Sequence, residues 1–75
     1  MTDADWGERA KRLLKAELAR ADLSYEQLAL KLAEIGLLET KASIASKISR
    51  GTFSASFLLA VLKVAGCASI RLEDV

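Results

Sequence analysis

The residues best suited to chemistry lie between positions 40 and 52, where cations and short hydroxyl side chains occur without an acid. Lys41, Lys47 and Arg50 supply positive charge, and Ser43 and Ser46 supply hydrogen-bond donors on short side chains. Cations attract phosphate, and short polar side chains let a helix approach the edges of bases closely. This combination suits contact with double-stranded DNA, although a solvated face on a small helical bundle would have a similar composition.

The composition argues against an enzyme and against a metal site. The chain has no histidine and one cysteine, so it lacks the usual general base and the usual ligands of zinc. Ser43 and Lys47 are four residues apart, which would bring a hydroxyl near an amine on a helix. A lysine base must be desolvated to lower its pKa, however, and this face is polar. We therefore expect a binding protein with no cofactor and no small-molecule substrate.

Apolar residues recur at helical spacing and predict the elements that must hold this face. Leu13, Leu14 and Leu18 fall on one stripe, which predicts a helix over about residues 5–21, with Asp5 and Glu8 as its capping box. Further helices are expected at about residues 25–35, 41–50 and 55–65, followed by a short segment at 67–75. The sequence thus predicts a single all-α domain over residues 1–75, a compact bundle of four to five short helices.

Polar residues and glycines mark where the shorter helices start and stop. The predicted N-caps are Ser24, Thr40 and Ser54, and the predicted stops are Gly36, Gly51 and Gly66. Gln27, three residues after Ser24, completes a capping box. At Gly51 we expect a positive φ, which glycine adopts freely and a β-branched residue does not.

Several apolar residues fall outside the regular pattern. Two adjacent leucines in a connection usually fold back onto a core, so Leu37 and Leu38 are both expected to be covered. Trp6 is expected to cover the end of the core rather than to anchor an interface. Cys67 is expected to be a small core residue near a helix end. The tail beyond Cys67 suits either a short extended segment or one closing helical turn.

The net charge of +1 hides a polarised distribution of charge. Residues 9–20 and 40–52 carry an excess of cations, and residues 1–8 and 22–39 an excess of acids. The longest apolar run, residues 57–62, is far too short to span a bilayer, and the acidic N-terminal residues do not form an export signal. We therefore expect a cytoplasmic protein without membrane contact. Because the apolar content exceeds what one small core buries, we also expect a homodimer.

Two segments carry a resemblance to a known family. Residues 23–29, LSYEQLA, followed by residues 44–51, IASKISRG, resemble the helix-turn-helix pattern of the lambda-repressor-like (Cro/C1, XRE) family. More narrowly, residues 13–74, with KISRGTFSASF at their centre, are similar to a group of short bacterial proteins catalogued only as a domain of unknown function. The broad resemblance implies a bundle of four or five helices, DNA binding and often a homodimer. The narrow resemblance brings no established activity.

The broad resemblance also implies roles for individual residues. Ser43, Ser46 and Lys47 would lie on recognition-helix positions that face base edges. The residues near phosphates would be Tyr25, Gln27, Lys41, Arg50 and Thr52, together with the amides that start the second helix. Packing in the core is an equally good role for Tyr25. The sequence departs from the family pattern in its longer stretch between Ala29 and Ile44, and in Ser49, where glutamate is common.

These observations predict a sequence-specific DNA-binding module of a small bacterial or phage-type transcriptional regulator, acting as a homodimer on paired half-sites. The alternative is a helical protein-interaction or antitoxin-like module that keeps the fold without binding DNA. Because Lys47 and Arg50 lie outside the apolar stripe of their helix, we expect alanine at both positions to weaken DNA binding and to leave stability almost unchanged.

Overall fold

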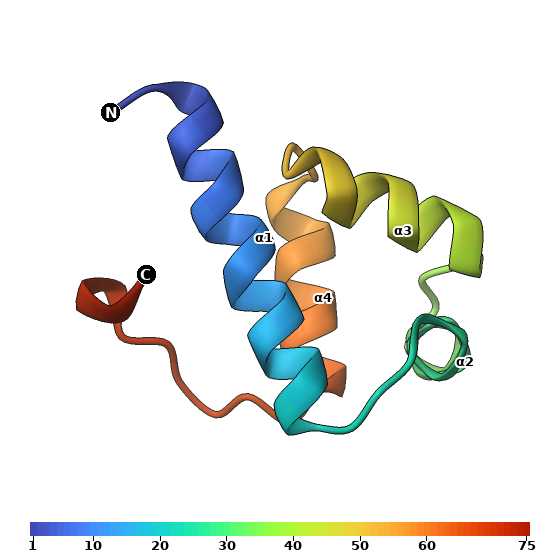
Figure 1. Cartoon of the computed structure of the whole chain (residues 1–75). Coiled ribbons are helices and arrows are strands. Elements are labelled where there is room, and N and C mark those ends of the chain that lie inside the picture. Colours follow the sequence, from blue (N-terminus) through green and yellow to red (C-terminus); the bar gives the residue numbers. More distant parts are fainter.

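Polar residues that cap the backbone determine where each helix begins. The computed structural model describes residues 1–75 as four α-helices and one 3₁₀ turn, with no strands (Figure 1). The helices are α1 (Asp3–Arg20), α2 (Tyr25–Glu34), α3 (Lys41–Arg50) and α4 (Ala55–Val64), and the turn is η1 (Leu72–Asp74). At the start of α1, α2 and α3, the capping side chain and the side chain three residues later each accept a hydrogen bond from the other's backbone N–H. The predicted all-α class is confirmed.

α1 begins two residues earlier than the sequence predicts. Its cap is Thr2, whose hydroxyl accepts from Asp5 N at 3.3 Å, while the Asp5 carboxylate accepts from Thr2 N at 2.8 Å. The prediction that Asp5 and Glu8 form the capping box was wrong, because Asp5 is the partner of the cap rather than the cap. The hydrogen bonds from Thr2 also lower the pKa of the Asp5 carboxyl.

Glycines in the left-handed conformation end α2 and α3, as predicted. Gly36 has a φ of 86° and Gly51 a φ of 67°. After Gly36 the chain reverses, so that Leu37 N donates to Leu32 O at 2.9 Å and Leu37 packs against the core. The next side chain, Leu38, is 84% exposed. The prediction that both leucines are covered was therefore wrong for Leu38, because the reversal after Gly36 returns only Leu37 to the core.

The core lies where the apolar faces of the four helices meet. It consists of Leu14, Leu18, Leu28, Leu32, Ile44, Ile48, Phe57, Val61 and Leu62. α1 and α2 each pack against both α3 and α4. In Figure 1, α1 and α4 run in similar directions, α3 lies across them and α2 is seen end-on. Only Ile44 and Ile48 of α3 are buried, which leaves most of this helix available for other contacts.

α1 and α3 cross where two glycines face each other. A Cβ atom added to Gly51 would lie 2.6 Å from Gly7 O, and one added to Gly7 would lie 3.0 Å from Gly51 O. Ordinary contacts of a Cβ atom begin at 3.4 Å. The two backbones therefore touch directly, and the crossing leaves no room for a side chain at Gly51 and little room for one at Gly7.

The N-terminal turns of α1 and the tail lie at the edge of the bundle. The prediction that Trp6 covers the core was wrong: Trp6 is 54% exposed, two turns before the first core residue of α1, and Arg9 lies 5.2 Å from its ring centre. Residues 67–71 form no regular element and lead into η1, which is the closing helical turn that the sequence allowed. Cys67 packs against the core, as predicted. No helix combines the length and the apolar character needed to cross a membrane.

Candidate nucleic-acid interface

α3 has an outer face that is short-chained and free of acids. Its exposed residues are Lys41, Ala42, Ser46, Ser49 and Arg50. The three between the cations are alanine or serine, and the two cations stand at the two ends of the helix. A helix with such a face can approach a grooved polyanion closely and meet phosphates at either end.

The C-terminal end of α3 brings three predicted site residues together. The Arg50 guanidinium donates to Ser46 Oγ at 2.9 Å. Gly51 ends the helix, and the exposed Thr52 follows in the turn. Thr52 lines a shallow hollow of about 340 Å³ that it shares with Trp6 at the start of α1. Asp3 lines the same hollow, so this end of α3 is open and polar, with Arg50 as its cation and Asp3 as a nearby acid.

Lys41, at the other end of α3, is paired with an acid of α2. Its Nζ lies 3.3 Å from Glu26 Oε1, and the two side chains are 65% and 72% exposed. An ion pair this exposed is worth at most about 1 kcal/mol. A phosphate can therefore replace Glu26 as the partner of Lys41 at little cost.

Lys47 turns toward a carboxylate that the connection between α2 and α3 supplies. Lys47 Nζ lies 2.5 Å from Glu39 Oε2 and 5.1 Å from the centre of the Phe57 ring. Ser43 Oγ donates to the other carboxylate oxygen of Glu39 at 2.6 Å. Ser43 also takes part in the cap of α3, where its backbone N–H donates to Thr40 Oγ1 at 3.0 Å. Two residues predicted to face bases are thus held at Glu39 in the free protein.

Glu39 is the site residue that sequence reasoning missed. Its side chain is only 6% exposed. Burial by itself raises the pKa of Glu39, but hydrogen bonds from Lys47 and Ser43 and the charge of Lys47 outweigh burial, so its pKa lies below the usual value. Glu39 is therefore charged at neutral pH and neutralises Lys47. Its spacing of four residues from Ser43 and eight from Lys47, about one and two helical turns, is the signal that the sequence holds.

The start of α2 holds two further predicted site residues. Tyr25 is half-buried and packs against the core, which is one of the two roles that the sequence allowed. Gln27 Oε1 accepts from Ser24 N at 2.9 Å within the cap, and its amide nitrogen remains able to donate. Glu26 stands between them, and its negative charge opposes the binding of an anion at this helix start.

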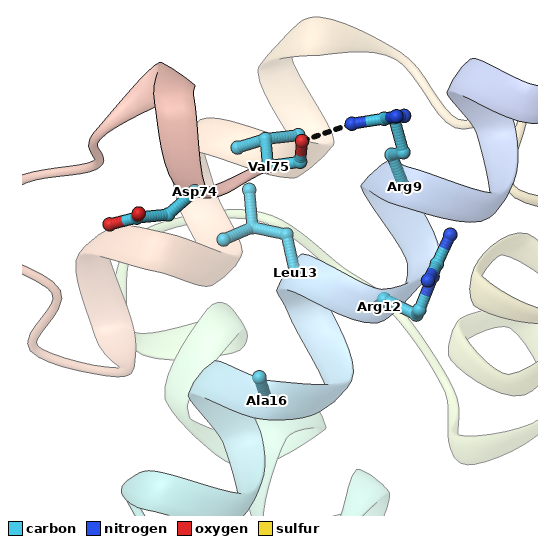
Figure 2. A pocket seen from close by; sticks show the side chains of 6 residues that line it. All are labelled: Arg9, Arg12, Leu13, Ala16, Asp74 and Val75. Atoms are coloured by element: carbon cyan, nitrogen blue, oxygen red, sulfur yellow. Dashed lines mark hydrogen bonds between the residues drawn. The ribbon is translucent and has the colours of Figure 1, made fainter.

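α1 carries a separate group of cations beside the tail. Arg9 and Arg12 line a pocket of about 440 Å³ together with Leu13 and Val75. Figure 2 shows both arginines on one side of this pocket and the carboxylate of Asp74 pointing away from them. Arg9 donates to the backbone oxygen of Val75. No residue of α3 lines the pocket, so these cations do not extend the face of α3.

A polar cluster joins the end of α1 to the end of α4. Arg20 donates to Glu17 Oε1 at 2.8 Å and to Ala65 O at 3.2 Å. Burial and the neighbouring Glu17 raise the pKa of Cys67, so its thiol is protonated at neutral pH. The cluster connects chain segments and has no reactive thiolate. The structure contains no group of three or more His, Cys, Asp or Glu side chains that could hold a metal ion.

Comparison with known proteins places the chain in a family. No curated protein and no solved structure matches it. Residues 6–70, most of the chain, match the family described as a domain of unknown function (DUF6471). This match supports the narrow resemblance and does not extend to the lambda-repressor-like family, so the helix-turn-helix type remains a prediction. The chain belongs to the DUF6471 family.

Proposed function

We propose that this domain binds double-stranded DNA as the reading module of a small bacterial or phage-type transcriptional regulator. The observation that carries the proposal is the outer face of α3, which places Ser46, Ser49 and Ala42 between two terminal cations and includes no acid. The resemblance of residues 23–29 and 44–51 to the lambda-repressor-like family supports a helix-turn-helix type, with α3 as the recognition helix.

α3 has the proportions that a major groove requires. The groove is about 12 Å wide, and an α-helix with its side chains is about 10–12 Å across. The ten residues of α3 span about 15 Å. Lys41 and Arg50 at the two ends are thus far enough apart to reach phosphates on both sides of the groove, while Ser46 and Ser49 face the bases.

In this arrangement, the contacts of Glu39 determine which side chains of α3 are available to contact bases. Because Ser43 and Lys47 are both bound to Glu39, direct base contacts fall to Ser46 and Ser49. Phosphate contacts fall to Lys41, Arg50 and Thr52, which are exposed. Through Glu39, Lys47 and Ser43 instead fix the connection that leads into α3.

The proposal predicts a strong salt dependence and a loss of affinity when both terminal cations are removed. We expect the double variant Lys41→Ala/Arg50→Ala to bind random-sequence duplex DNA at least about tenfold more weakly, and to lower the slope of log affinity against log salt by about two. Fluorescence anisotropy of a labelled duplex over a salt series measures both quantities. Because both side chains are exposed, the melting temperature should stay close to that of the parent.

A matched control is available in Lys15→Ala/Arg71→Ala, which removes one lysine and one arginine that are also exposed but lie outside α3. This control should lose much less affinity than the α3 variant. Equal losses in the two double variants would show that only net charge matters, and an unchanged affinity in Lys41→Ala/Arg50→Ala would remove α3 from the interface.

One observation favours the alternative of a protein-interaction module. Leu38 is 84% exposed in the connection that leads into α3, and Leu30 is 69% exposed on α2. Exposed leucines of this kind suit an apolar partner helix. A complex formed through them should change little with salt, so the salt series separates this alternative from DNA binding.

A further inference from the structure

The domain exposes more surface than a compact chain of its mass. Its accessible surface is 5025 Å², whereas a compact monomer of 8.1 kDa exposes about 4,500 Å². The excess of about 500 Å² is a large part of the roughly 800 Å² that each partner buries in a protein–protein interface of standard size. The excess is therefore comparable in size to the area that a protein–protein contact would cover.

A protruding leucine and an apolar hollow lie side by side on the outer surface of α4. Leu59 is 65% exposed. It borders a hollow of about 320 Å³ whose other apolar lining comes from Leu62, Cys67, Ala68 and Ile70. No acidic residue lines this hollow. The surface thus offers both an apolar projection and an apolar depression.

Opposite charges stand beside this apolar centre. A second hollow, of about 260 Å³, shares Lys63 with the first and is also lined by Lys31, Glu34 and Ile35 of the α2 end. Lys31, Glu34 and Lys63 have no ion-pair partner within the chain. An apolar centre with a charged edge is the composition of a protein interface.

We propose that this face, which consists of Leu59, the two hollows and Lys63, binds the same face of a second copy of this chain. A two-fold contact requires a surface that is complementary to itself. Here Leu59 of each copy can enter the hollow beside Leu59 of the other, and Lys63 of each can pair with Glu34 of the other. Two other exposed apolar residues do not combine these features: Trp6 is stacked with Arg9, and Leu38 lines neither hollow.

The proposed dimer does not depend on DNA binding. This face and the outer face of α3 share no residue. A protein that dimerises without binding DNA, or binds DNA without dimerising, would therefore separate the two proposals.

Sedimentation equilibrium of the full chain tests the dimer. We expect the mass of two chains at high micromolar concentration and the mass of a single 8.1 kDa chain on dilution. Leu59→Glu places a charge in the apolar hollow and should weaken the dimer about a hundredfold or more. Because Leu59 is already 65% exposed within one chain, the variant should keep the helical circular dichroism of the parent.

Leu38→Glu is the matched control, because it alters a leucine that is exposed as well but lies in the connection between α2 and α3. It should leave the dimer unchanged. Lys63→Glu should weaken the dimer about threefold to tenfold, and adding Glu34→Lys should restore it by reversing the pair. A monomeric parent, or a dimer that survives Leu59→Glu, overturns the proposal. The proposal is also overturned if the Leu38→Glu variant loses the dimer while the Leu59→Glu variant keeps it.

Cys67 gives a second measurement that needs no substitution. Cys67 lines the apolar hollow and carries the only thiol in the chain. Alkylation of Cys67 should therefore slow severalfold as the protein concentration rises through the range in which the dimer forms. The same rate at all concentrations would contradict a dimer that uses this hollow.

Discussion

Any side chain at Gly51 is expected to lower the free energy of unfolding by about 2–4 kcal/mol, a large fraction of what so small a domain has. Two effects add at this position. The φ of 67° strains most L residues, and valine most of all. A Cβ atom would also lie 2.6 Å from Gly7 O, a backbone atom that cannot move aside unless α1 shifts. Arg50, which precedes Gly51, would shift as well, so the DNA affinity that we propose for α3 should fall too.

Asparagine substitutions separate the two effects. Asparagine tolerates the left-handed region, so at a position limited by φ alone it should be nearly neutral. Gly36 is such a position, with a φ of 86° and no atom within 4 Å of an added Cβ. Chemical unfolding followed by circular dichroism should therefore show a large loss for Gly51→Asn and a small one for Gly36→Asn. Equal losses would mean that the contact with Gly7 does not limit the site.

Lys47→Met is expected to destabilise the domain by about 1–3 kcal/mol at neutral pH, although Lys47 carries a charge on a helix surface. Methionine keeps most of the length of the side chain but removes the ammonium group, which lies over the Phe57 ring as well as beside Glu39. It leaves the Glu39 carboxylate, 6% exposed, without its cation and with Ser43 as the remaining side-chain donor. The sequence-based expectation that Lys47 can be replaced without loss of stability is therefore not what the structure predicts.

The pH dependence identifies the cause of this loss. The pKa of Glu39 lies below its ordinary value of 4.5 in the folded parent, so the pair's contribution to stability is present above that value and disappears as the pH falls through the folded pKa. In Lys47→Met, burial without the cation raises the pKa instead, and protonation of Glu39 should reduce the deficit of the variant at about pH 4. Glu39→Gln/Lys47→Met removes the unpaired charge and should recover most of the stability at neutral pH. If Lys47→Met alone were as stable as the parent at neutral pH, the Glu39–Lys47 pair would have no stabilising role.

The helix boundaries could be predicted because their signals are local. Ser24 and Gln27 form the cap of α2 within three residues, and Gly36 ends the same helix immediately after its last turn. The cap of α1 was misplaced for a local reason too, since Thr2 and Asp5 form the same kind of pair and only the geometry shows which of them is the cap. Helix boundaries set by patterns within one helical turn can therefore be predicted to within a few residues.

The contacts that shape the candidate site could not be predicted, because they depend on how the elements are placed in space. The positive φ of Gly51 follows from its position after a helix, but the close approach of Gly7, far earlier in the chain, requires the crossing of α1 and α3. Glu39 lies in a connection, and only the path of that connection brings its carboxylate to Lys47. The charges along α3 alone include no acid, so they gave no sign that Lys47 has an ion-pair partner.

The reciprocal caps of α1, α2 and α3 have a kinetic consequence. Each helix start is stabilised by residues only three positions apart, so each can begin to form before any helix meets another. Helices of ten residues, such as α2, α3 and α4, are marginal in isolation, and they persist only once they dock. A chain built this way has short loops to close and belongs with the small helical domains that fold in microseconds to milliseconds. Among the helix pairs that pack together, α1 and α4 are farthest apart along the chain, so their docking closes the longest loop.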